Sequence, residues 1–160
     1  MAEPRNWGRV VTYLAGAALV LLIAQYFLGL WTNVYAPAQF ASFQTGIDSG
    51  PYYPAPLRVH VANGDVLFLL SIVALVFAAL ARQLRLIVPA LVLAVSIYVA
   101  GELGMLFVNS TPNAPIDSFG MGAMFLVALL SAAGLLMMSW RSRPVARSKP
   151  EMPATGAQVN

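Results

Sequence analysis

Four long apolar stretches fill most of this 160-residue chain, and their length decides what it can fold into. They are Val10–Trp31, Val59–Leu80, Leu86–Val108 and Ser118–Ser139. A helix needs about 20 apolar residues to cross the hydrocarbon core of a bilayer. Only 9% of the residues are charged, whereas about a quarter are in an ordinary soluble domain. The sequence therefore predicts an all-α fold, a four-helix transmembrane bundle, in a multi-pass protein of the cell membrane.

The basic residues lie almost entirely on one side of these stretches. Arg5 and Arg9 precede the first, Arg82 and Arg85 separate the second from the third, and Arg141, Arg143, Arg147 and Lys149 follow the fourth. Of the other two connections, one has only Arg58 and one has neither Lys nor Arg. The positive-inside rule then places both termini in the cytoplasm. Topology explains the positive charge, so we expect the lipid bilayer as a partner and no nucleic acid.

The connections divide the chain further. We expect a transmembrane domain over residues 1–140, with an outer loop at about 32–58, and a disordered cytoplasmic tail over 141–160. The outer loop is rich in proline and aromatic residues, which predicts a cap or a contact surface. The connection at 81–85 is so short that the second and third helices must form an antiparallel hairpin. Pro89 is expected in the first turn of the third helix, where a missing N–H costs little.

Polar residues gather in the predicted outer half of the bundle. Glu102 is the sharpest candidate, because a carboxylate at membrane depth is costly unless it is paired, hydrated or protonated. Helical periodicity puts His60, Asn63 and Gly64 on one face of the second helix and points Asp65 away from it. The candidate ligand-binding residues are His60, Glu102, Asp65, Asn33, Tyr98 and Asn109. The alternative for Glu102 is a structural role in joining helices, and the alternative for His60 is an interfacial histidine near the start of a helix.

The chemistry that these residues allow is limited. The chain has no cysteine and one histidine, so thiolate chemistry and bis-histidine haem within one chain are excluded. Haem b, a quinone or a metal stay open as cofactors. The candidate metal ligands are His60, Met105 and Met121, but thioethers and carboxylates suit different metals.

Four short patterns carry a family resemblance. They are Leu28-Gly29-x-x-x-Asn33-x-Tyr35, His60-x-x-x-Gly64, Gly101-x-x-Gly104 and Ser118-x-x-Met121. Together they resemble a group of short, uncharacterised four-helix membrane proteins of bacteria and archaea, which implies four spanning helices. The His60 element is also similar to histidine-bearing helices of b-type cytochrome bundles. The chain departs from those bundles because it lacks the second histidine.

Three functions remain open at this point. The sequence favours a non-enzymatic accessory subunit of a larger membrane complex, respiratory or transport machinery, because it contains no complete catalytic set. Its partners would be other membrane subunits or further copies of itself, and Gly101, Gly104, Gly120 and Gly122 would let helices approach closely. The alternative is an electron-transport or ligand-binding bundle that holds haem, quinone or a metal through His60 and Glu102. The third is an ion-coupled carrier using Glu102 and Asp65.

Overall fold

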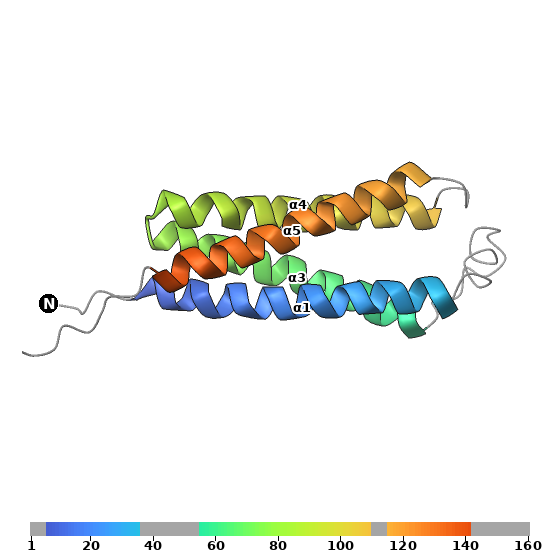
Figure 1. Ribbon diagram of the computed structural model, residues 1–160, viewed down its shortest axis with the longest axis horizontal. Helices are drawn as coiled ribbons and strands as arrows, with labels where there is room; N and C mark the ends of the chain where they lie inside the picture. The colour runs from blue at the N-terminus through green and yellow to red at the C-terminus, as the bar shows by residue number, and fades with distance from the viewer. Residues whose placement is uncertain (1–5, 36–54, 110–114, 142–160) are drawn as a thin grey trace, which may run out of the picture.

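Four long helices make up the computed structural model, which describes residues 6–35, 55–109 and 115–141 (Figure 1). They are α1 (Trp7–Tyr35), α3 (Ala55–Leu80), α4 (Leu84–Asn109) and α5 (Pro115–Arg141). Each contains a segment long and apolar enough to cross a membrane. The predicted all-helical fold with four spans is therefore confirmed, and every helix extends a few residues beyond the predicted stretch. The predicted tail at 141–160 begins one residue too early, because Arg141 ends α5; the rest of it and most of the outer loop lie outside the described residues.

The helices form a closed antiparallel ring. Each helix packs against its neighbours in the chain, and α1 packs against α5 to close the circle. The start of α1, the α3–α4 turn and the end of α5 lie at one end of the bundle, here called the terminal end (Figure 1). The opposite end, here called the loop end, is where α1 and α4 finish and α3 and α5 begin. The polar residues nominated by the sequence belong to this loop end.

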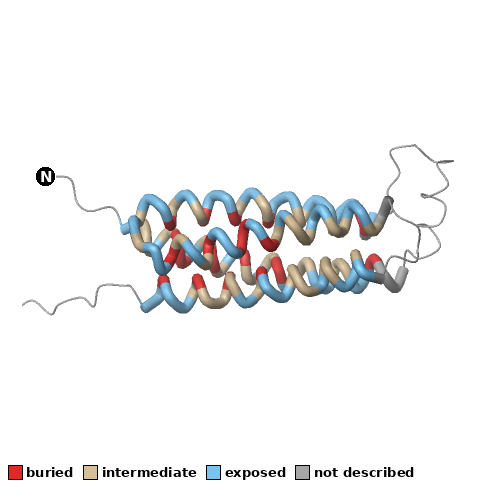
Figure 2. Tube along the Cα trace, turned by 90° about the horizontal axis from the view of Figure 1, so that it is seen from above, coloured by how far each residue is buried: buried red, intermediate tan, exposed pale blue. Residues whose placement is uncertain are grey.

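Alanines and leucines build most of the core. Its buried side chains are Val11, Ala15, Ala18, Leu22, Leu67, Ala78, Leu86, Ala90, Leu93, Ala128, Ala132 and Leu135. Alanines let helix backbones approach closely, which is how helices associate where lipid removes the hydrophobic drive between them. Nearly all of these residues lie in the half of their helix nearer the terminal end, and Figure 2 shows the buried positions gathered there. Apolar packing is therefore concentrated at one end, and the loop end depends more on other contacts.

Four buried hydroxyl groups are satisfied within their own helices. Thr12 donates to the carbonyl oxygen of Gly8 at 2.9 Å, and Thr32 donates to that of Leu28 at 2.8 Å. Ser71 and Ser139 each donate to a carbonyl three residues earlier in their helix. Since each bond is local, these residues need no second helix as a partner.

A tight turn joins α3 to α4. Arg82 adopts a left-handed backbone conformation with φ of 55°, and its N–H donates to the carbonyl of Ala79 at 2.9 Å. This conformation ends α3 and lets α4 begin at Leu84, two residues before the predicted start. The prediction that Pro89 lies in the first turn is therefore wrong: Pro89 lies inside α4, where the ring removes one backbone hydrogen bond.

The left-handed conformation at position 82 predicts the effect of a glycine there. Arg82→Gly should be about 1 kcal/mol more stable than Arg82→Ala, because only glycine adopts positive φ without a steric cost. Both variants lose the same guanidinium, so their difference isolates the backbone term. Unfolding in mixed detergent micelles, followed by circular dichroism, measures it. Equal stability of the two variants would show that position 82 carries no such strain.

Candidate functional site

A hydrogen-bonded cluster joins α1 and α3 near the loop end. Gln25 comes from α1, and His60 and Asn63 come from one face of α3. The Asn63 side-chain amide nitrogen lies 2.7 Å from Gln25 Oε1 and 3.2 Å from the carbonyl oxygen of Leu21. Gln25 Nε2 lies 3.2 Å from His60 Nε2. We call Gln25, His60 and Asn63 the α1–α3 polar cluster.

The direction of these bonds fixes the tautomer of the histidine. A backbone carbonyl can only accept, so the Asn63 atom facing Leu21 must be the nitrogen. That nitrogen also donates to Gln25, whose facing atom is therefore the oxygen. Gln25 then presents its amide nitrogen to His60, so Nε2 of the ring accepts and the proton sits on Nδ1. His60 Nδ1 is buried and has no hydrogen-bond partner.

Glycines make room for the cluster. A Cβ on Gly29 would stand 3.3 Å from Cε1 of His60, and a Cβ on Gly64 would stand 3.5 Å from Nε2 of Gln25. The imidazole therefore packs against the bare backbone of α1, and the glutamine amide packs against that of α3. This explains the short glycine patterns near residues 29 and 64 as features of helix packing.

The two acidic candidates do not join this cluster. Asp65 and Glu102 are both exposed on the outside of the bundle. Asp65 lies eight residues inside the apolar span of α3 and Glu102 five residues inside that of α4, about 12 Å and 8 Å along the helix. Neither forms an ion pair or hydrogen bond with another described residue. The expectation that Asp65 points away from the His60 face agrees with this placement.

The remaining candidates lie on several surfaces. Tyr98 is 54% exposed, and its ring contacts that of Phe68 on α3 with centroids 5.9 Å apart. Met121 of α5 packs on α4, with its sulfur 3.3 Å from where a Cβ on Gly104 would stand. Met105 is exposed. The side chains of Asn33 and Asn109 lie outside the described part of the structure.

The predicted close-packing glycines differ among themselves. A Cβ on Gly120 would stand 3.0 Å from Cδ1 of Leu103, so Gly104 and Gly120 both serve the α4–α5 contact. At Gly101 and Gly122 an added Cβ would meet nothing within 4 Å. The prediction of close packing therefore holds for Gly104 on α4 and Gly120 on α5, and not for Gly101 or Gly122.

The arrangement limits metal or haem binding through His60. No group of three or more His, Asp or Glu side chains in residues 6–35, 55–109 and 115–141 is placed to hold a metal ion. The lone pair of Nε2 is already used by Gln25, and the other ring nitrogen carries the proton. Iron or copper would therefore require this hydrogen bond to break first.

Comparison with known sequence families, with curated proteins and with solved structures gives no match for the chain. The resemblance to short four-helix membrane proteins therefore stays a prediction. The fold and the site therefore define only the class of protein: an all-helical bundle with four helices able to span a membrane.

Gln25 is not among the ligand residues that the sequence predicts, although it is the hydrogen-bond partner of both His60 and Asn63. The sequence signal for Gln25 is a polar amide inside the apolar stretch Val10–Trp31, which indicates a side chain that needs a hydrogen-bond partner.

The contact between Gly29 and His60 predicts a cost for an added methyl group. Gly29→Ala should be about 1 kcal/mol less stable than Gly101→Ala, because the methyl must push the imidazole away from Gln25. The gain in helix propensity is shared by the two substitutions, and Gly101 faces open space. Detergent unfolding of both variants measures the difference. Equal stability would contradict the close packing of His60 on α1.

The bond directions predict a spectroscopic result. Nitrogen-15 NMR of selectively labelled histidine in micelles should show protonated Nδ1 and unprotonated Nε2 at neutral pH. Gln25→Leu removes the donor to Nε2 and should release this preference, whereas Asp117→Asn, on another helix, should leave it unchanged. A proton on Nε2 in the unmodified protein would refute the deduced bond directions.

Proposed function

We propose that this protein is a non-catalytic accessory subunit of a larger membrane complex. The observation that carries the proposal is the division of its polar side chains. The α1–α3 polar cluster is used to hold two helices together, and Asp65 and Glu102 face outward. His60 and Glu102, the pair expected to hold a cofactor, do not converge. This favours a role in assembly over chemistry inside the bundle.

Energetics support an assembled state. On insertion scales an aspartate costs about 2.5–3.5 kcal/mol at the centre of a membrane helix, and Asp65 and Glu102 lie about 12 and 8 Å inside the ends of their spans. Such residues normally face a bundle interior or a water-filled cavity. Here two of them lie on the outer surface of one small bundle, which favours a second membrane protein covering them.

The basic residues support an orientation within the complex. Arg9, Arg82, Arg85 and Arg141 belong to the terminal end, whereas Arg58 is the described basic residue near the loop end. By the positive-inside rule, the terminal end and both termini would lie in the cytoplasm. The acidic residues and the α1–α3 polar cluster would then lie toward the outer face of the cell membrane.

The unpartnered Nδ1–H of His60 favours a second candidate function. A buried donor without an acceptor costs about 1–3 kcal/mol. The carbonyl oxygen of a lipid-soluble quinone could accept from it if α1 moved aside. The same protein would then be a quinone-binding bundle, with the donor supplied by His60 and the imidazole oriented by Gln25.

One preparation tests both candidates. The protein is extracted from its own membranes in mild detergent, and its native mass and reduced-minus-oxidised spectrum are recorded. The accessory role predicts a stable assembly well above 17.1 kDa plus detergent, with no haem band assigned to this chain. Migration as a lone chain would contradict it. Extractable quinone in stoichiometric amount, lost in His60→Phe, would support the second candidate.

A further inference from the structure

The outward face shared by α3 and α4 carries an organised set of side chains. The contact between Phe68 and Tyr98 fixes the level at which these two helices meet. Asp65 lies three residues from Phe68 toward the loop end, and Glu102 lies four residues from Tyr98 in the same direction. At 1.5 Å per residue these offsets are about 4.5 and 6 Å. The two carboxylates therefore lie at nearly one membrane depth.

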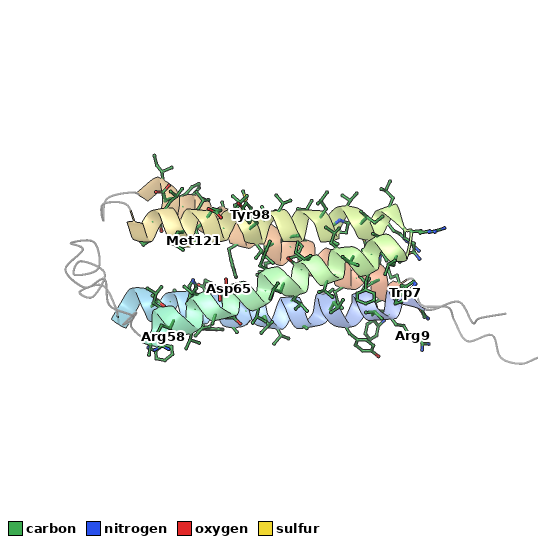
Figure 3. The ribbon with its side chains drawn as sticks, turned by 180° about the vertical axis from the view of Figure 1, so that it is seen from behind. Trp7, Arg9, Arg58, Asp65, Tyr98 and Met121 are labelled. Carbon is green, nitrogen blue, oxygen red and sulfur yellow. The ribbon has the colours of Figure 1, made fainter. Side chains whose placement is uncertain are left out.

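Helical geometry also places them on one surface. Residues three or four apart share a side of a helix, so Asp65 lies beside Phe68 and Glu102 beside Tyr98. Figure 3 looks onto α3 and α4 and shows the labelled Asp65 and Tyr98 at similar levels along the bundle. We call the surface formed by Asp65, Phe68, Tyr98 and Glu102 the acidic face.

The chain does not supply a counter-charge for this face from its described residues. Arg58 is the described basic residue nearest in sequence to Asp65, but it is exposed, seven residues closer to the loop end, and unpaired with either acid. The other described basic residues, Arg9, Arg82, Arg85 and Arg141, lie at the terminal end. A second copy of the chain would bring the same residues at the same depths. Its own basic side chains would therefore not meet the acidic face of the first copy.

We propose that the acidic face binds a transmembrane helix of another protein that carries an arginine or lysine at the depth of Asp65 and Glu102. A helix is required because only helices and closed barrels satisfy the backbone within lipid. A guanidinium forms bidentate, charge-assisted hydrogen bonds with carboxylates and can engage two at once. The exposed Tyr98 ring, held by Phe68, gives that cation an aromatic surface next to the acids. This inference rests on the proposed accessory role and names its docking surface.

A designed helix provides the first test. The full-length chain, labelled at one terminus, is reconstituted in phosphatidylcholine vesicles with a single-span leucine–alanine helix that carries one arginine at matching depth. Energy transfer measures binding. The arginine helix should bind at least about tenfold more tightly than the same helix with leucine there. Equal binding of the two helices would overturn the proposal.

Variants show whether the acids cause that preference. Asp65→Asn with Glu102→Gln should abolish it, and each single change should reduce it several-fold. Asp117→Asn removes a carboxylate from the first turn of α5 and should leave it intact. The charge-conserving exchange Asp65→Glu with Glu102→Asp should retain it, which separates lost charge from disturbed folding. A preference that survives the double amide variant would refute the acidic face as its origin.

Photocrosslinking in the native membrane separates this inference from the accessory role. A photoreactive phenylalanine at Tyr98 should capture a transmembrane segment with an arginine or lysine at the crosslinked level. The same group at Leu130, an exposed residue of α5, is the comparison. An intact native assembly that crosslinks only through position 130, or a crosslink from 98 to lipid or to a second copy, refutes the acidic face alone. A chain that migrates by itself refutes both proposals.

Discussion

Lipid offers no hydrogen bonds, and the described polar groups of this bundle meet that constraint in different ways. Hydroxyls such as Thr12 and Ser71 are satisfied by carbonyls of their own helix. Side-chain amides reach further and bond between α1 and α3, where Nε2 of His60 accepts from Gln25 while its buried Nδ1 has no partner. Carboxylates need a basic side chain or a hydrogen-bond donor beside them, and the described residues of this bundle supply neither to Asp65 or Glu102. The hydroxyls thus need one helix and the amides need two, and the proposed accessory role would supply the carboxylates with a second protein.

Packing and polar bonding are divided along the length of the bundle. Toward the terminal end, alanines bring the backbones together, and dispersion contacts hold the four helices. Toward the loop end, fewer residues are buried, and the α1–α3 polar cluster takes a larger share. Interhelical hydrogen bonds in membranes contribute about 0.6 kcal/mol on average. That is small, so the cluster specifies which face of α3 meets α1 more than it stabilises the bundle.

Sequence patterns predict where each helix lies and which residues share one of its faces, but they do not predict which helices pack together. Hydropathy predicts four spans, and the 100° periodicity correctly separates Asp65 from the His60 face. The ring order of helices depends on packing that no periodicity contains, so the pairing of His60 with Gln25 could not be anticipated. Gly101 and Gly104 show the same limit, because they differ only in which faces α5 covers. The start of α4 was misplaced because Arg82 adopts a conformation that sequence patterns assign to glycine or asparagine.

The histidine also shows how a polar network can restrict function. An isolated imidazole in a membrane helix is a versatile group that can bind iron, accept a proton or donate to a carbonyl. In this structure Asn63 donates to the backbone carbonyl of Leu21, which fixes the orientation of its amide. That orientation fixes the amide of Gln25, and Gln25 in turn fixes which nitrogen of His60 accepts. Only donation from Nδ1 then remains without breaking the network, and Nδ1 faces the backbone near Gly29. The same contacts that join α1 and α3 therefore reduce the chemical choices of the histidine, whereas the outward acids Asp65 and Glu102 have no bond to another described residue.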